Sequence, residues 1–229
     1  MEMIELWHLI NKVYDPEYLA GAVKTKISVV DKVFDSISFT PRSIYMTAYN
    51  PIVDQLADEY DVYLPADQMV FVTNPKAMVA SEDRTYDCVL ALDEYLTYFA
   101  DEQQQKDQLA RLAKLCKGWL ITTLVDYKNL APYKKNQVEV IHDYKSDAIF
   151  LEQNSPISTD KQAWNSWFYA ITNHQILDSV GPIPRRTMYF KQLAKYASDL
   201  GSLNYVVQKN TLYRGFGRKH WEHIITIRF

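Results

Sequence analysis

The stretch that decides the fold runs from Ser43 to Asp67 and reads SIYMTAYNPIVDQLADEYDVYLPAD. It opens with a short apolar run over 43–48, rich in Ile, Tyr and Thr, which is typical of a buried strand. A turn follows at 49–51, Tyr-Asn-Pro, where Asn can cap a helix and Pro suits its first position. Apolar residues at helical spacing come next, and a second short strand, 62–64, leads to Asp67.

Strand, tight turn, helix, strand and acid follow one another here as in a nucleotide-binding βαβ unit. The turn after the first strand of such a unit is usually Gly-rich, because a bare backbone can approach a cofactor closely. In this chain the turn over 46–51 reads Met-Thr-Ala-Tyr-Asn-Pro and contains no glycine. The pattern predicts the fold, whereas the turn lacks the feature that favours cofactor binding.

The composition is that of a globular protein with a sizeable core. Of 229 residues, 48% are hydrophobic and 23% charged, and the net charge is −3. This balance gives no reason to expect binding to nucleic acid or to a membrane, and no run approaches the roughly 20 apolar residues of a membrane helix. The N-terminal residues do not read as a signal peptide. Cys88 and Cys116 lie in apolar runs and are interpreted as buried thiols, so we expect a cytoplasmic protein.

Helices precede the central unit, and strands and helices alternate after it. Residues 1–37 are predicted to be helical, with a fresh helix start at 15–17, and to cover an edge or a face of the sheet. The following alternation predicts a parallel sheet with helices on both faces. Its expected elements are strands over 69–73, 86–92 and 119–125 and a helix over 101–117 that ends at Gly118.

From Asp126 onwards the pattern favours antiparallel strands. The expected elements are strands over 138–141, 148–151, 164–171 and 175–180, a break at Pro182 and Pro184, a helix over 187–200, and a closing antiparallel pair over 203–212 and 221–229 around Arg214-Gly215-Phe216-Gly217. We therefore expect an N-terminal helical cap (1–40), a Rossmann-like core (41–125 and 185–229) and an antiparallel β insertion (126–184).

Together these segments resemble the class I S-adenosylmethionine-dependent methyltransferases. Residues 44–67 match the family's spacing from first strand to acid, and 86–93, YDCVLALD, is similar to its fourth-strand pattern, F/Y-D-x-V. Residues 185–229 resemble its last helix followed by a sixth strand and an antiparallel seventh. The resemblance implies an α/β fold, a three-layer Rossmann-like sheet that is mostly parallel with an antiparallel last strand, carrying N-terminal helices and a β-rich insertion.

The resemblance also implies S-adenosylmethionine as cofactor and a small-molecule substrate. The cofactor would lie near the residues that follow the strands: Thr47, Tyr49, Asp67, Asn74 and Asp93. Asp67 would accept hydrogen bonds from the ribose hydroxyls, and Asn74 lies where the family contacts adenine. Three of these positions have an alternative, because Asp67 could be a surface acid, Asn74 a turn residue before proline and Asp93 a helix cap.

Candidate substrate-binding residues are polar or aromatic: Glu94, Tyr95, Trp164, Tyr169 and Arg186. Glu94 and Tyr95 follow the fourth strand at the ligand-binding edge of the sheet. The aromatic residues could line a substrate pocket, form a homodimer patch or fill the core of the insertion. Arg186, with Arg185, could bind a carboxylate or phosphate, or could be a solvated surface charge.

No metal site and no known nucleophile motif is predicted, because the histidines lack ligand spacing. The family's first loop is acidic and Gly-rich, E/D-x-G-x-G, but this chain has Met46-Thr47-Ala48-Tyr49-Asn50. Two main hypotheses therefore stay open. One is a methyltransferase of a small molecule; the other is a methyltransferase-derived protein without cofactor that binds a protein partner. A different nucleotide-like ligand is a third, weaker alternative.

Overall fold

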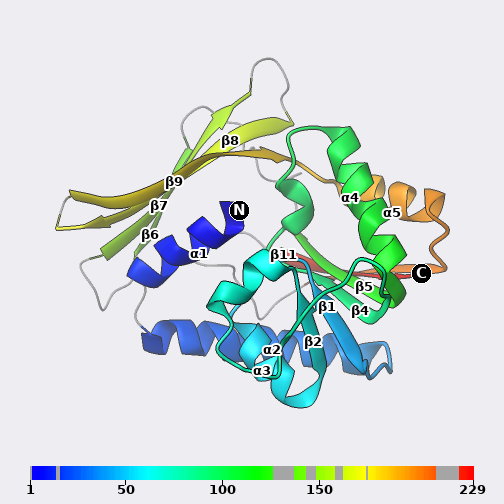
Figure 1. The fold of residues 1–229 in the computed structure, drawn as a ribbon. Helices are drawn as coiled ribbons and strands as arrows, with labels where there is room; N and C mark the ends of the chain where they lie inside the picture. The colour runs from blue at the N-terminus through cyan, green and yellow to red at the C-terminus, as the bar shows by residue number, and fades with distance from the viewer. Residues whose placement is uncertain are drawn as a thin grey trace.

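The computed structural model describes residues 2–13, 16–125, 137–142, 148–157, 162–173, 175–209 and 222–229. These residues form a seven-stranded sheet and a separate four-stranded sheet, with helices around both (Figure 1). The predictions that fall on Asp15, Asp126, 210–212, 214–217 and Trp221 lie outside the described residues. No helix among the described residues is long and apolar enough to cross a membrane.

The seven-stranded sheet has the order β10-β11-β5-β4-β1-β2-β3. Its strands are β1 (Ser43–Met46), β2 (Asp61–Leu64), β3 (Met78–Val79), β4 (Tyr86–Ala91), β5 (Cys116–Val125), β10 (Asn204–Lys209) and β11 (Glu222–Arg228). The first five run parallel to one another, whereas β11 runs antiparallel to both β5 and β10. This arrangement confirms the predicted α/β class with an antiparallel last strand.

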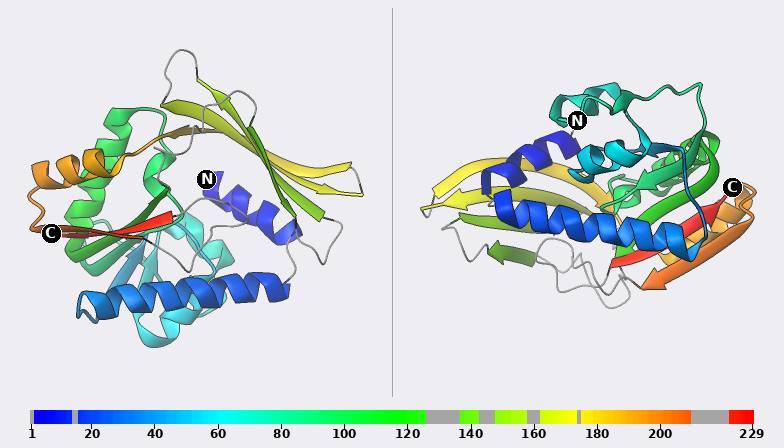
Figure 2. Two further views of the ribbon diagram at one scale, coloured as in Figure 1. Left: turned by 180° about the vertical axis from the view of Figure 1, so that it is seen from behind. Right: turned by 90° about the horizontal axis from the view of Figure 1, so that it is seen from below.

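Helices cover both faces of this sheet. On one face lie α2 (Pro16–Ser36) and α3 (Ile52–Glu59), and on the other lie α4 (Glu102–Leu115) and α5 (Phe190–Asp199) (Figures 1 and 2). Successive side chains of a strand point to opposite faces, so Ile44 and Met46 pack with α2 and α3, while Tyr45 packs with α4 and α5. Every residue of β1 is buried, as expected for a strand covered on both faces.

The second sheet is antiparallel throughout and has the order β6-β7-β8-β9. Its strands are β6 (Gln137–His142), β7 (Ala148–Pro156), β8 (Ala163–Thr172) and β9 (Gln175–Arg186). Helix α1 (Glu2–Val13) packs against this sheet, and Lys12 of α1 forms an ion pair with Asp178 of β9. Figure 1 shows α1 between the second sheet and the helices α2 and α3 of the first. Of the two predicted N-terminal helices, only α2 lies along the first sheet.

The predicted third strand at 69–73 is wrong. Residues Ala66–Phe71 form a short 3₁₀ helix, η1, and the third strand is Met78–Val79, which pairs with the end of β2. Hydrogen bonds from the Gln68 N–H to the Pro65 oxygen and from the Val72 N–H to the Met69 oxygen close its turns. The apolar run has high strand propensity, but Val70 is 69% exposed, so burial does not favour a strand there.

Two predicted breaks are also wrong. Gly118 does not end α4 but lies inside β5. Glycine is required there because a Cβ atom would approach the Asp87 carbonyl oxygen of β4 to 2.4 Å. Strand β9 continues through Pro182 and Pro184 to Arg186. Prolines are tolerated there because β9 is an edge strand, where a missing N–H need not break a ladder bond. As predicted, Cys88 and Cys116 are free and buried.

Candidate functional site

The carboxyl ends of β1, β2 and β4 meet at one edge of the first sheet. From β1 the chain continues through β2 and β3 on one side, whereas β4 and β5 lie on the other side of β1. The strand order therefore reverses between the neighbouring strands β1 and β4. Such a topological switch point is where open α/β sheets bind their ligands. The candidate site is built from the residues that follow these three strands.

The first loop, 47–50, is held by hydrogen bonds and by aromatic packing. The Thr47 N–H donates to the Leu90 oxygen over 3.1 Å, and the Tyr49 N–H donates to Gln68 Oε1 over 3.1 Å. The Tyr49 ring lies 6.0 Å from the ring of Trp7 and 5.2 Å from that of Phe71. Burial raises the pKa of the Tyr49 phenol to about 12. Bulky side chains thus pack around the loop at which a nucleotide-binding βαβ unit usually has glycine.

Gln68 links two residues that the sequence predicted for the site. Its carbonyl accepts from Tyr49, and its Nε2 donates to Asp67 Oδ2 over 3.3 Å. Gln68 is buried, whereas Asp67 is exposed at the start of η1. Sequence analysis missed Gln68, because it lies between Asp67 and the predicted strand over 69–73 and one glutamine carries no signal of its own.

Asp93 lies at the centre of a second polar group. Its backbone is left-handed, with φ of 57°, and its Oδ2 accepts a hydrogen bond from Asn50 Nδ2 over 2.5 Å. Its Oδ1 forms an ion pair with Nζ of Lys26, which comes from α2. The side chains are 23% exposed for Asp93 and 9% for Lys26. The sequence carried a usable signal for Lys26, a charge placed among the apolar residues of the buried face of α2.

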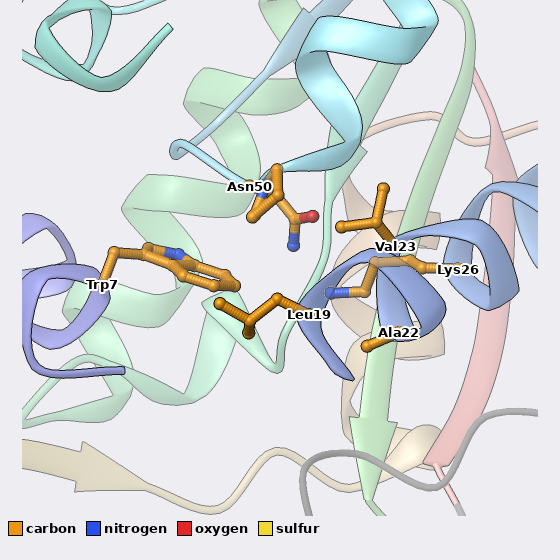
Figure 3. Close-up of a pocket in the computed structure, with 7 residues that line it drawn as sticks. Trp7, Leu19, Ala22, Val23, Lys26 and Asn50 are labelled. Atoms are coloured by element: carbon orange, nitrogen blue, oxygen red, sulfur yellow. The ribbon is translucent and has the colours of Figure 1, made fainter. Parts of the chain in front are cut away.

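A pocket opens beside this group (Figure 3). Its cavity volume is about 10 Å³, which leaves room for about one water molecule and is far below the roughly 300–1,000 Å³ of ligand pockets. Figure 3 shows the Lys26 amine and the Asn50 carboxamide pointing toward one space, with Trp7 and Leu19 on another side. The lining residues are Trp7, Leu19, Ala22, Val23, Lys26, Asn50 and Pro51.

Glu94, the next residue, also has a left-handed backbone but points to the second sheet. Its Oε2 lies 2.7 Å from Nη2 of Arg185, whose Nη1 lies 3.3 Å from Oε1 of Glu152. Arg185 also donates to Thr97 Oγ1 over 3.0 Å. All three charged side chains are at most 5% exposed. The network joins the loop after β4 to β7 and β9.

The other predicted site residues are placed as follows. Trp164 is buried, donates from Nε1 to Ser166 Oγ over 3.1 Å, and lies with its ring 5.3 Å from the Arg185 guanidinium. Burial first, and then the Tyr45 phenol, raise the pKa of Tyr95 to about 12, and the Asp67 carboxylate adds to this shift.

Three predicted residues lie apart from this group. Asn74 binds the side chains of Asp54 and Asp58 and so ties its loop to α3. The Tyr169 hydroxyl lies 3.4 Å from Gln153 Oε1 within the second sheet. Arg186 donates from Nη2 to Gln162 Oε1 over 3.1 Å. The structure thus brings together Thr47, Tyr49, Asp67 and Asp93, with Glu94, Tyr95 and Trp164 adjoining.

Sequence analysis did not select Lys26, Asn50 or Glu152 for the site. It weighed Arg185 as an anion-binding residue or a solvated surface charge, and the second alternative is wrong because Arg185 is buried. Glu152 and Arg185 meet across strands that lie far from Glu94 in the chain, so no local spacing points to their contact. Among the residues that the structure describes, no group of three or more His, Cys, Asp or Glu side chains could hold a metal ion.

No protein-family model matches the sequence, and no curated protein matches it either. Solved structures do. DesVI of Streptomyces venezuelae is similar at 10% identity with a TM-score of 0.65, over 99% of this chain and 98% of that one. A methyltransferase of Clostridium acetobutylicum that depends on S-adenosylmethionine is similar at 10% identity with a TM-score of 0.63, over 96% and 94%. CalS10, an amino pentose methyltransferase of Micromonospora echinaspora with S-adenosylmethionine bound, is similar at 11% identity with a TM-score of 0.61, over 95% and 98%.

At identity this low, structural similarity establishes the fold alone, and the activity has to be argued from the site. The likeness extends over nearly the whole of this chain and of those relatives, so it includes the second sheet. The strand order with its antiparallel β11 agrees with the resemblance seen in the sequence. The chain has the class I S-adenosylmethionine-dependent methyltransferase fold.

Proposed function

We propose that this protein is an S-adenosylmethionine-dependent methyltransferase that acts on a small molecule. One observation carries the proposal. Lys26, Asn50 and Asp93, from three separate elements, converge beside a pocket at the switch point of a methyltransferase fold. A polar cluster in a pocket at this edge is what a ligand site in an open α/β sheet requires.

The residues present fit the polar parts of the cofactor. Asp67 would accept hydrogen bonds from the ribose, because its carboxylate is exposed beyond β2. Thr47, Tyr49 and Asp93 would border the rest of the cofactor. The pocket holds less than a complete cofactor, so binding requires the contact between Trp7 and Tyr49 to open.

S-adenosylmethionine supplies an electrophilic methyl group carried on a positively charged sulfur. The protein needs to align the accepting atom of the substrate and to exclude water, which its aromatic side chains can do without a dedicated catalytic set. The insertion, 126–184, would hold the substrate, since α1 packs against its sheet and reaches the first loop through Trp7. Two solved relatives are named an amino pentose and a sugar N-methyltransferase, so amino sugars are the first substrates to screen.

The alternative is a non-catalytic interaction protein that has lost cofactor binding. The packing of Tyr49 between Trp7 and Phe71 motivates it, but the solved relatives give it no support. The two hypotheses differ in one direct property, which is the affinity for S-adenosylmethionine and its product.

Isothermal titration with S-adenosylmethionine and S-adenosylhomocysteine tests the proposal. We expect saturable binding at micromolar affinity, and a loss of about tenfold or more for Asp67→Ala, because a hydrogen bond to a charged group contributes about 1.5–3 kcal/mol. Asp83→Ala is the matched control, since Asp83 is an exposed acid before β4 and away from the ligand edge. The absence of binding at millimolar ligand would overturn the proposal and favour the interaction protein.

A further inference from the structure

We infer that Arg185 is a positioning residue for the candidate site, because it fixes the left-handed turn that directs Asp93 toward the first loop. This inference deepens the proposed function, on which it rests, and gives the second sheet a part in ligand binding. Arg185 is buried near the end of β9 and so belongs to the second sheet, whereas Asp93 follows β4 of the first sheet.

The turn after β4 has a strained backbone. Two consecutive residues other than glycine are left-handed there, with φ of 57° for Asp93 and 58° for Glu94. Such a conformation is unfavourable for a residue that has a Cβ atom, and it persists only where the surroundings fix it. The contacts that fix this turn therefore determine where the Asp93 carboxylate lies.

Arg185 holds the turn at two points. Its Nη2 lies 2.7 Å from Glu94 Oε2 and donates to Thr97 Oγ1 over 3.0 Å. The Thr97 hydroxyl in turn donates to the Glu94 carbonyl oxygen over 2.8 Å. One guanidinium therefore fixes the side chain of Glu94 directly and its backbone through Thr97.

The guanidinium of Arg185 is itself held by the second sheet. Its Nη1 lies 3.3 Å from Oε1 of Glu152 in β7, and its centre lies 5.3 Å from the ring of Trp164 in β8. The ring of Tyr98 lies 4.5 Å from the same group. A planar guanidinium held by carboxylates and aromatic rings has little freedom to move. The turn is thus fixed from the second sheet.

The two residues of the turn have partners on opposite sides. The Glu94 side chain contacts Arg185, whereas the Asp93 carboxylate accepts a hydrogen bond from Asn50 of the first loop. Because the two residues share a peptide unit, a change of backbone conformation at Glu94 displaces Asp93. Without Arg185 the turn should relax in most molecules, and the apparent affinity for a ligand falls in proportion to the share that keeps it.

The decisive experiment separates positioning from stability. It compares two triple variants by isothermal titration with S-adenosylhomocysteine. Both carry Arg185→Met and Glu152→Gln, and they differ only in Glu94→Gln or Glu94→Gly. Neither leaves a charge of the network buried, so both should fold. Glutamine keeps the cost of the left-handed backbone, whereas glycine adopts this backbone without strain.

We expect the triple variant with Glu94→Gln to bind S-adenosylhomocysteine about tenfold or more weakly than the wild-type protein. The triple variant with Glu94→Gly should bind within about threefold of wild type, because its turn no longer needs the guanidinium. A merely structural role of Arg185 would give both variants the same affinity.

Controls keep the outcomes separate. Urea denaturation checks that both triple variants are folded. Arg111→Met is the matched arginine control, since its ion-pair partner Glu82 is exposed and precedes β4, and it should leave the affinity unchanged. If the triple variants do not fold, Arg185→Lys with and without Glu94→Gly gives the same comparison, because lysine keeps a positive charge beside Glu152 without the fork of donors.

Equal affinities of the two compared variants, whether weak or as in the wild-type protein, would overturn this inference and leave the proposed function standing. A wild-type protein that binds no S-adenosylhomocysteine would overturn the proposed function and this inference with it.

Discussion

Asp93 and Glu94 are neighbours with nearly the same left-handed backbone, yet they belong to different kinds of ion pair. The pair of Asp93 with Lys26 borders a pocket, and the carboxylate is 23% exposed. The pair of Glu94 with Arg185 is sealed, with side chains 5% and 2% exposed, and includes a second carboxylate from Glu152. The difference indicates two tasks. One pair is partly open to solvent beside a pocket, and the other fastens the second sheet to the loop after β4.

The sealed network should respond most strongly to substitution. Arg185→Met leaves Glu94 and Glu152 buried without their shared counter-charge, and we expect the free energy of unfolding to fall by about 3–5 kcal/mol. Urea denaturation followed by circular dichroism measures this change. The triple variant Arg185→Met, Glu94→Gln, Glu152→Gln should recover much of the loss, because it leaves no buried charge unpaired. A loss below about 1 kcal/mol for Arg185→Met would show that the network does not hold the insertion.

The pair at the pocket should matter less for folding than for binding. Lys26→Met leaves Asp93 with its hydrogen bond from Asn50 and with access to water, so we expect a loss of about 1–2 kcal/mol in the free energy of unfolding. Urea denaturation of this variant beside Arg185→Met measures the contrast. An equal loss in both would contradict the distinction between an accessible and a sealed pair.

The exposed pair between Lys12 and Asp178, with side chains 47% and 40% exposed, gives the smallest expected effect. The hydrogen bond from Lys12, followed by that from the Ser179 N–H, lowers the pKa of Asp178 below its ordinary value of 3.8. A lowered carboxyl pKa stabilises the fold at pH above the unfolded value, and this contribution is lost as pH falls through the folded value. Lys12→Met should return the pKa of Asp178 toward its ordinary value, as measured by carboxyl NMR titration, while stability at pH 7 barely changes. A titration curve that Lys12→Met leaves unaltered would contradict this assignment.

The main elements of the fold could be predicted from the sequence, whereas the contacts that build the site could only partly be. Strands β4 and β5 appear as apolar runs between polar residues, and α4 shows leucines at helical spacing, so local patterns suffice. Asp67 and Asp93 could be selected because both follow strands at the ligand edge. Lys26 was detectable as a charge on an apolar helix face.

The remaining site residues depend on tertiary placement. Gln68 reaches the first loop from η1, a segment whose β-prone residues favour a strand when only the sequence is known. The exposure of η1, which disfavours a strand, is visible only in the structure. Arg185 contacts Glu94 because β9 continues past two prolines to its last residues beside the loop after β4. No spacing in the sequence predicts this contact. The role of Tyr49 likewise depends on α1, which brings Trp7 to the first loop.

A crystal structure of the protein with S-adenosylhomocysteine tests the central claim most directly. The account predicts that the ligand lies at the carboxyl ends of β1, β2 and β4, with its ribose near Asp67. It also predicts that the contact between Trp7 and Tyr49 opens. A ligand bound elsewhere, or no ligand bound at saturating concentration, would contradict the account.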